Sequence, residues 1–205
     1  MKNNWDKRYS AEEYIYGEEP NHFFQEILHR FSPGEILLPA DGEGRNGVYA
    51  ATQGWNVEAF DLSEQARMKA LQLAAGKKVD VHYQVMDFSA ISEAYYKESF
   101  DVIALIFVHL PSEVKKTYFP LLRGLLKPGG YIIIEGFSKN HIAYQKKNPG
   151  IGGPPDADMM YSPDLILELF PDLEILCLLE NEVQLNEGLG HNGVGSVIRY
   201  IGKKK

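Results

Sequence analysis

The segment from Leu38 to Gly47 carries the strongest chemical signal in this chain. Gly42, Gly44 and Gly47 follow an apolar run with the spacing G-x-G-x-x-G, and Asp61 comes about 20 residues after this loop. Glycines let the backbone approach a ligand, and a carboxylate after the next strand can accept hydrogen bonds from both ribose hydroxyls. The pattern therefore predicts a nucleoside-binding loop, although glycines that only turn the chain would give the same spacing.

Three further side chains follow in the expected adenine position and have two possible roles. Met86 and Phe88 flank Asp87, so the pair could enclose a base while the carboxylate accepts from its amino group. Asp87 is equally suited to cap a helix that begins near Ser89. The two roles are compatible.

Proton transfer, if it is needed, has two candidate residues. His109 comes just after an apolar run, and histidine titrates near neutral pH; as an ordinary loop residue it would only be a polar group at a helix start. Glu135 ends a later strand and is expected to face a substrate. His191, between the last two expected strands, is predicted to be a surface-loop residue.

The strands and helices that position these residues are predicted from the spacing of the hydrophobic residues and from residues that commonly cap helices. Apolar runs alternate with amphipathic stretches, which is typical of a doubly wound α/β sheet, and the last two strands are expected to pair antiparallel at one edge. The predicted strands are residues 35–38, 56–60, 79–84, 100–107, 131–135, 173–179 and 196–201, and the predicted helices begin near residues 21, 44, 63, 89, 111 and 162.

Residues 138–161 interrupt this rhythm. Their Pro- and Gly-rich part, 148–155, is predicted to hold no regular element, and a loop of this length in a compact domain is usually functional. The chain is expected to be a single domain over residues 1–205, with a helical cap segment at residues 1–34 and an active-site loop at 138–161.

Bulk composition excludes several classes of function. A net charge of -7 argues against a general nucleic-acid surface, and a single cysteine, Cys177, excludes a disulfide framework or a cysteine-rich metal site. No apolar run is long enough for a membrane span and no leader is recognised, so we expect a cytoplasmic protein without a metal site. We expect a monomer or weak homodimer that acts without nucleic acid or membrane.

The chain resembles class I S-adenosylmethionine (SAM) methyltransferases, in particular the group of tellurite-resistance and thiopurine methyltransferases. Segments in the order of that family cover nearly the whole chain, and the Lys-Pro-Gly-Gly turn before a strand is more specific than the glycine loop. The matching segments are residues 5–9, 16–21, 42–46, 57–63, 100–103, 125–130 and 135–137.

This resemblance implies a three-layer Rossmann-like methyltransferase fold, with a mostly parallel seven-stranded sheet and an antiparallel edge strand. It also implies SAM as cofactor, S-adenosylhomocysteine as product, and a small-molecule methyl acceptor, of which a thiol, selenide or telluride is the class that the resemblance suggests. The catalytic candidates are His109 and Glu135, and the implied cofactor-binding residues are Tyr16, Ala40, Asp41, Gly42, Glu43, Gly44, Arg45, Asp61, Leu62, Met86, Asp87, Phe88 and Phe107.

Two positions depart from the family pattern. Leu38 stands where an acidic residue is usual, and Ala40 stands where a glycine usually opens the loop. Asp41 is expected to replace the missing carboxylate at the methionine amino group. Two alternatives stay open: a non-catalytic SAM- or nucleotide-binding protein, and an NAD(P)-dependent oxidoreductase. The second leaves the Lys-Pro-Gly-Gly turn unexplained.

Overall fold

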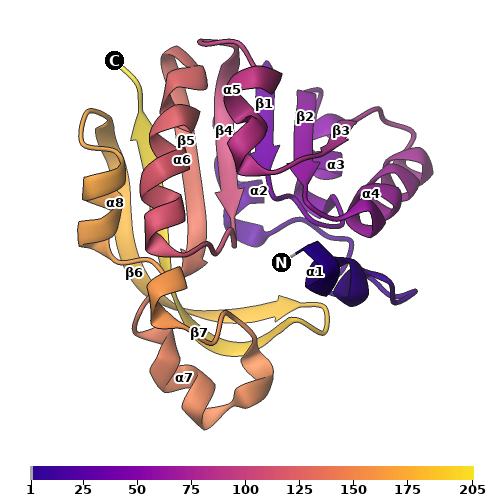
Figure 1. Cartoon of the computed structure of the whole chain (residues 1–205), viewed down its shortest axis with the longest axis vertical. Coiled ribbons are helices and arrows are strands. Elements are labelled where there is room, and N and C mark those ends of the chain that lie inside the picture. Colours follow the sequence, from indigo (N-terminus) through magenta and orange to yellow (C-terminus); the bar gives the residue numbers. More distant parts are fainter. Residues whose placement is uncertain (1) are drawn as a thin grey trace.

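Seven strands form one sheet in the order β3-β2-β1-β4-β5-β7-β6 in a computed structural model that describes residues 2–205 (Figure 1). Strands β1 to β5 are parallel, whereas β7 runs antiparallel to both β5 and β6. The expected antiparallel pairing at one edge is confirmed; the reversed strand is β7, and β6 is outermost. The strands are Glu35–Pro39 (β1), Asn56–Asp61 (β2), His82–Val85 (β3), Phe100–Ile106 (β4), Leu126–Phe137 (β5), Glu174–Glu187 (β6) and His191–Lys203 (β7).

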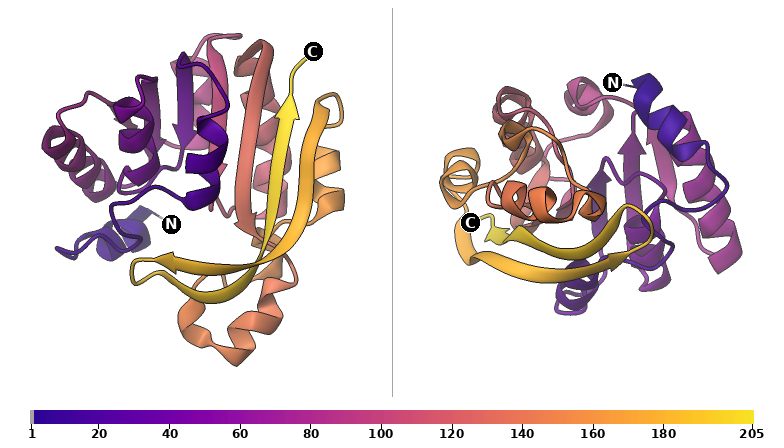
Figure 2. Two further views of the ribbon diagram at one scale, coloured as in Figure 1. Left: turned by 180° about the vertical axis from the view of Figure 1, so that it is seen from behind. Right: turned by 90° about the horizontal axis from the view of Figure 1, so that it is seen from below.

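Helices cover both faces of the sheet (Figures 1 and 2) because successive strand residues alternate between two apolar cores. Leu37 packs in the core beneath α5, α6 and α8, while its neighbours Ile36 and Leu38 pack beneath α2, α3 and α4. The helices are Lys2–Tyr9 (α1), His22–Leu28 (α2), Arg45–Thr52 (α3), Glu64–Lys77 (α4), Ile91–Ala94 (α5), Ser112–Leu125 (α6), His141–Lys147 (α7) and Pro163–Leu169 (α8). Within residues 2–205, no helix has the length and apolar character to cross a membrane.

Helix starts agree best with the sequence predictions, because caps are local. The Ser63 hydroxyl accepts from the Ala66 amide at 3.1 Å and begins α4, and Ser162 caps α8 in the same way. Helix α4 ends at Lys77, and its C-cap residue Lys78 adopts a left-handed conformation (φ 59°).

Several predicted boundaries are wrong. The third strand is His82–Val85 and not 79–84, the fifth begins at Leu126 and not at 131, and the helix expected to begin near residue 89 is reduced to a 3-10 turn followed by α5. Residues 138–161 contain α7 and two 3-10 turns, Pro149–Ile151 and Ala157–Met159. The fully buried Ile151 anchors the first of these turns, so tertiary burial orders a segment whose local sequence predicts a loop.

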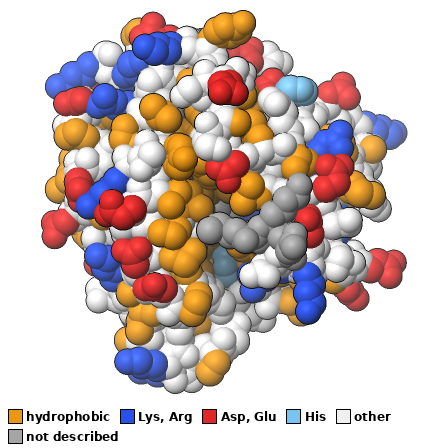
Figure 3. Space-filling model, in the orientation of Figure 1, with side chains coloured by type: hydrophobic (Ala, Val, Ile, Leu, Met, Phe, Trp, Pro, Cys, Tyr) orange, Lys and Arg blue, Asp and Glu red, His pale blue; other side chains and the backbone are white. Residues whose placement is uncertain are grey.

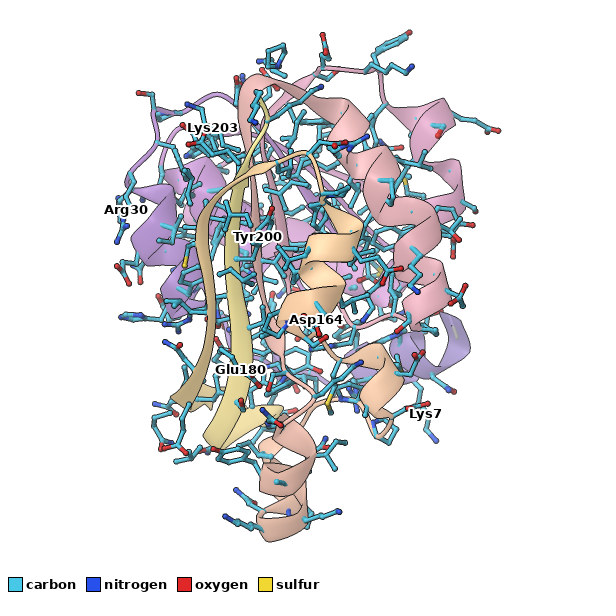
Figure 4. All side chains as sticks on the ribbon, turned by 90° about the vertical axis from the view of Figure 1, so that its left-hand side faces the viewer. Lys7, Arg30, Asp164, Glu180, Tyr200 and Lys203 are labelled. Carbon is cyan, nitrogen blue, oxygen red and sulfur yellow. The ribbon has the colours of Figure 1, made fainter. Side chains whose placement is uncertain are left out.

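The last two strands are much longer than predicted and form a bent hairpin whose tip reaches the N-terminal segment (Figure 2). At this tip the Gly190 amide donates to the Ile15 carbonyl at 2.9 Å. At the other end of the hairpin, Tyr200 lies between β7 and α8 (Figure 4), with its ring stacked on Phe170 at 5.8 Å. One end of the hairpin is therefore part of the main sheet, and its other end packs against the N-terminal segment.

The Lys-Pro-Gly-Gly turn lies at the amino end of β5, away from the carboxyl ends of the parallel strands. Leu126 pairs with Phe100 and Tyr131 with Val102, so residues 127–130 bulge out between them. The Lys127 ammonium donates to Asp101 at 2.8 Å, which lowers the pKa of that carboxyl against the effect of its burial. This turn is a structural feature of the fold and does not belong to the candidate site.

Candidate active site

The glycine loop follows β1 at the carboxyl edge of the sheet, where ligands of such folds bind. Hydrophobic side chains gather around this end of the molecule between α6 and α1 (Figure 3). Gly42 and Gly44 both have left-handed backbones (φ 59° and 87°), and Gly44 is the N-cap of α3. A Cβ on Gly44 would lie 2.5 Å from the Ala70 Cβ, so this glycine also lets the loop touch α4.

Gly44→Ala is expected to destabilise the fold by about 2–4 kcal/mol, since it adds overpacking against Ala70 to an unfavourable positive φ. Urea unfolding measures the loss. Gly76→Ala, in α4 with no atom within 4 Å of the added Cβ, is the matched control and is expected to stabilise by about 0.5–1 kcal/mol. Equal effects of the two substitutions would contradict this assignment.

Gly47 has a specific role that the glycine pattern alone does not indicate. Its amide donates to Asp41 Oδ2 at 3.0 Å, and a Cβ there would lie 2.6 Å from the same oxygen. Burial in this loop raises the pKa of Asp41 to about 8. Leu38 packs in the core, so the carboxyl groups that the loop itself supplies are those of Asp41 and Glu43.

Asp61 lies where the second strand was expected to deliver it, facing the loop. Its two carboxylate oxygens accept from the Gly42 amide at 3.2 Å and the Ser63 amide at 2.9 Å. Burial raises the pKa of Asp61 to about 6, although these hydrogen bonds favour the ionised form. The Leu62 amide also favours the ionised form, and the acceptor capacity that remains on the carboxylate suits ligand hydroxyls. Leu62 follows it and is half-buried.

Met86, Asp87 and Phe88, which follow β3, have different structural roles. Asp87 is exposed and caps the 3-10 turn Phe88–Ala90 by accepting from the Ser89 amide at 2.9 Å. Phe88 is buried in the core, edge-on to Phe60 at 5.2 Å. Met86 is half-buried, and its amide donates to the Asp61 carbonyl at 3.0 Å. Of the three, Met86 is the one bonded directly to the neighbouring strand end.

Tyr83 and Tyr9, which were not among the predicted site residues, both lie against Gly42 of the loop. Tyr83 donates to the Gly42 carbonyl at 2.6 Å, and the Tyr9 hydroxyl would lie 2.9 Å from a Cβ on Gly42. Tyr9 is 5% exposed, and burial followed by the nearby Asp61 charge raises its pKa. Tyr9 belongs to the Trp5–Tyr9 segment that carries the family resemblance, which was the available signal. Helix α1 therefore covers the glycine loop (Figure 1).

Glu43 holds the N-terminal segment in place. One carboxylate oxygen accepts from the Lys69 ammonium at 2.6 Å and the other from the Ile15 amide at 2.8 Å. The same Lys69 donates to the carbonyls of Ala11 and Glu13. Both oxygens of Glu43 are thus engaged by the chain itself.

Arg45 and Tyr16 meet at the hairpin tip. Arg45 pairs with Glu187 at 2.9 Å and donates to the Tyr16 carbonyl at 3.3 Å. The Tyr16 ring packs on His191 with centroids 4.6 Å apart. His191 is 4% exposed and opposes Glu187 in the β6–β7 ladder, so the prediction of a surface-loop histidine is wrong.

Glu135 is almost fully buried and its carboxylate is occupied. Asn21 donates to one oxygen at 2.7 Å, and Arg199 donates to the other. Burial raises the pKa of Glu135, with the Arg199 charge acting in the opposite direction. Asn21 also accepts from the Phe24 amide as the N-cap of α2, so this group ties three elements together.

His109 has no free ring nitrogen. Nδ1 donates to the Met159 carbonyl at 3.1 Å, and Nε2 accepts from the Phe137 amide at 3.2 Å. Burial is the main cause of a pKa lowered to about 3. The imidazole is therefore held neutral in one tautomer, an arrangement that orders the 157–161 segment and leaves no lone pair for a substrate proton.

In the unfolded chain His109 is protonated below its ordinary pKa of 6.5, whereas in the folded protein it stays neutral down to about pH 3. The contribution of neutral His109 is thus present above pH 6.5 and is lost as pH falls, by about 2 kcal/mol between about pH 7.5 and 5. Asp41 and Asp61 have raised pKa values and act in the opposite direction. The measurement is therefore the difference in unfolding free energy between wild type and His109→Gln, which we expect to shrink by that amount; a constant difference would contradict it.

Both a family model and curated protein sequences are similar to parts of this chain. Residues 36–130 match the family model of the methyltransferase domain. Uncharacterized methyltransferases of Schizosaccharomyces pombe are 36% identical over 70 residues, which is 34% of this chain and 47% of theirs. A polyketide synthase-nonribosomal peptide synthetase of Aspergillus clavatus is 28% identical over 122 residues, 56% of this chain and 3% of that protein. The chain thus spans about half the length of the yeast relatives.

Solved structures share the whole fold at low identity. One, from work on the conversion of a disulfide bond into a thioacetal group during echinomycin biosynthesis, has a TM-score of 0.81 at 16% identity and covers 100% of this chain and 92% of its own. TehB from Haemophilus influenzae gives 0.71 at 19% identity, with 100% and 67% covered. Magnesium protoporphyrin IX methyltransferase from Synechocystis, with bound S-adenosylhomocysteine, gives 0.68 at 14%, with 99% and 94% covered. The match to the methyltransferase domain over residues 36–130 and the shared fold together support a class I SAM-dependent methyltransferase.

Proposed function

We propose that this protein uses SAM to methylate a small-molecule acceptor. The observation that carries the proposal is the Asp61 carboxylate, desolvated at the end of β2 and hydrogen-bonded to the Gly42 amide of the loop. Burying a carboxylate at a pKa of about 6 costs stability, and an acceptor for ribose hydroxyls is a reason to retain it.

The residues present suit SAM. The loop of residues 40–44 follows the carboxyl end of β1, and its glycines let the backbone approach a ligand closely, so this loop would hold the methionine part. Asp61 would hold the ribose, Met86 would lie toward the adenine, and Asp41 would meet the amino group that Leu38 cannot. Bound SAM supplies a methyl group already activated by its sulfonium.

The acceptor would approach from the carboxyl end of β4. Phe107, Phe137 and Tyr16 give this side aromatic character, and their rings surround His191. These apolar walls favour a neutral small molecule with a soft or weakly acidic nucleophile, and the thiol class suggested by the family resemblance fits them.

Thermal shift tests the proposal, because a true ligand raises the melting temperature by mass action, by about 2.7 kcal/mol of added stability at a hundred times Kd. SAM and S-adenosylhomocysteine are each expected to raise Tm, and NADH is expected to leave it unchanged. A shift with NADH and none with either SAM species would favour an oxidoreductase. A SAM shift without methylation of any thiol, phenol, selenite or tellurite acceptor would favour a non-catalytic SAM-binding protein.

A further inference from the structure

We propose that His191, oriented by Glu187, accepts the proton from a hydroxyl or thiol on a flat, apolar acceptor. This inference rests on the proposed methyl transfer and names its substrate class and its proton acceptor. It begins from the antiparallel ladder, in which Glu187 and His191 are directly opposed at the last pair before the hairpin tip.

The Glu187 carboxylate is fixed by three donors. Asn21 donates to Oε1 at 2.8 Å, and Arg45 donates to Oε2 at 2.9 Å. His191 Nδ1 lies 3.0 Å from the same Oε2. Because an ionised carboxylate only accepts, Nδ1 must carry the hydrogen, and Nε2 of the neutral ring presents a lone pair.

His191 differs from the other two histidines around Phe137. His109 uses both ring nitrogens, and so does His141, whose Nε2 lies 3.1 Å from the Gly152 carbonyl and whose Nδ1 accepts from the Ser196 amide. Within residues 2–205 no side chain or backbone group hydrogen-bonds to His191 Nε2. Among the described residues, the Tyr200 hydroxyl is the polar side-chain group that is both fully buried and without a hydrogen-bond partner. Since His191 Nε2 has no partner and does not belong to that class, it is not fully buried. Its lone pair is therefore available to a small molecule.

Three aromatic rings define what can reach this nitrogen. The centroids of Phe107, Tyr16 and Phe137 lie 4.3, 4.6 and 5.1 Å from that of His191. Phe107 directly follows β4, and Arg45, which holds Glu187, directly follows the glycine loop. The pair thus lies between the proposed SAM loop and the strand end from which an acceptor would enter, and its surroundings suit a planar apolar body.

The charges around the pair suit reversible protonation. Burial lowers the pKa of His191, Glu187 raises it, and the positive charges of Arg45 and Arg8 lower it further. Burial would raise the pKa of Glu187, but its bonds with His191 and Arg45 outweigh this and lower it to about 2. His191 is thus neutral at pH 7, beside a carboxylate that stays ionised.

In the step itself, the acceptor O–H or S–H bond breaks and an N–H bond forms at Nε2. The electron pair stays on the acceptor atom as the nucleophile, and the new imidazolium faces the Glu187 carboxylate. The proton passes to water after the product leaves, so no further reactant is consumed. An acceptor that is already an anion needs no such step.

Binding of 4-nitrophenol tests the inference without SAM, because the ionised phenol absorbs visible light. Wild type is expected to lower the apparent pKa of the bound phenol, because the phenolate can pair with a protonated His191. His191→Gln is expected to bind the phenol without this lowering of its pKa. His141→Gln, a matched loss of a histidine beside Phe137, is expected to ionise it as wild type does.

Methyl transfer gives the second readout. His191→Gln is expected to slow transfer to weakly acidic phenols by about 10²–10⁴-fold, and to slow transfer to a fluorinated thiophenol that is already ionised by less than about tenfold. Glu187→Gln, which keeps the side-chain shape, is expected to show the same split to a smaller degree, and it replaces the first variant if His191→Gln does not fold.

Equal losses for the two acceptors, or phenolate formed as well by His191→Gln as by wild type, would overturn the proton-acceptor role. A normal SAM thermal shift in that same variant would then leave the proposed methyltransferase function standing. Absence of a SAM shift in wild type would reject the function and the inference together.

Discussion

Asp61→Ala is expected to reduce SAM affinity more than about a hundredfold, the largest effect on binding that we expect from one substitution. Two charge-assisted hydrogen bonds to ribose hydroxyls, each contributing about 1.5–3 kcal/mol, would be lost together. Isothermal titration with SAM and with S-adenosylhomocysteine measures the change. Both ligands carry the same ribose, so both should lose affinity by a similar factor.

Asp61→Asn separates binding from folding. The amide keeps one acceptor for the Gly42 or Ser63 amide but loses the charge, so SAM should bind about tenfold or more weakly while the fold persists. Asp61 has a raised pKa, so its contribution to stability is present at low pH and is lost as pH rises through about 6. The asparagine variant should lack that loss. Asp101→Asn, at the other end of the sheet, is the matched control, and a similar loss of SAM affinity there would refute the assignment.

Arg45→Met is expected to produce the largest loss of stability, about 3–5 kcal/mol, because it leaves the buried Glu187 carboxylate without its cation. For a chain of this size the melting temperature should fall by about 6–20 °C. Differential scanning fluorimetry together with urea unfolding measures both quantities.

The control is an ion pair of similar length at the surface. Arg67 lies 2.8 Å from Glu64, and both side chains are exposed (37% and 48%). Arg67→Met should change stability by less than about 1 kcal/mol, since exposed pairs are weak. If the two substitutions cost the same, the Arg45–Glu187 pair does not act as a buried one.

Part of the candidate site follows from local rules. The apolar run before the glycine loop predicts a strand, and the next run predicts that Asp61 ends the second strand; the structure confirms both positions. Ser63 is recognisable as a cap for the same reason, because a helix start depends on neighbours within one turn. Asp87 was ambiguous by these rules, and its cap role is now visible.

The sequence by itself determined the α/β alternation, the parallel sheet, the loop glycines and Asp61, because hydrophobic period, caps and turns act within a few residues. Only the tertiary structure decided how the histidines are used. The register of β7 against β6 places His191 opposite Glu187. In contrast, both ring nitrogens of His109 are hydrogen-bonded, one to the Phe137 amide and the other to the Met159 carbonyl. Such partners lie tens of residues away along the chain, and a one-residue change of register would turn a strand residue to the other face of the sheet.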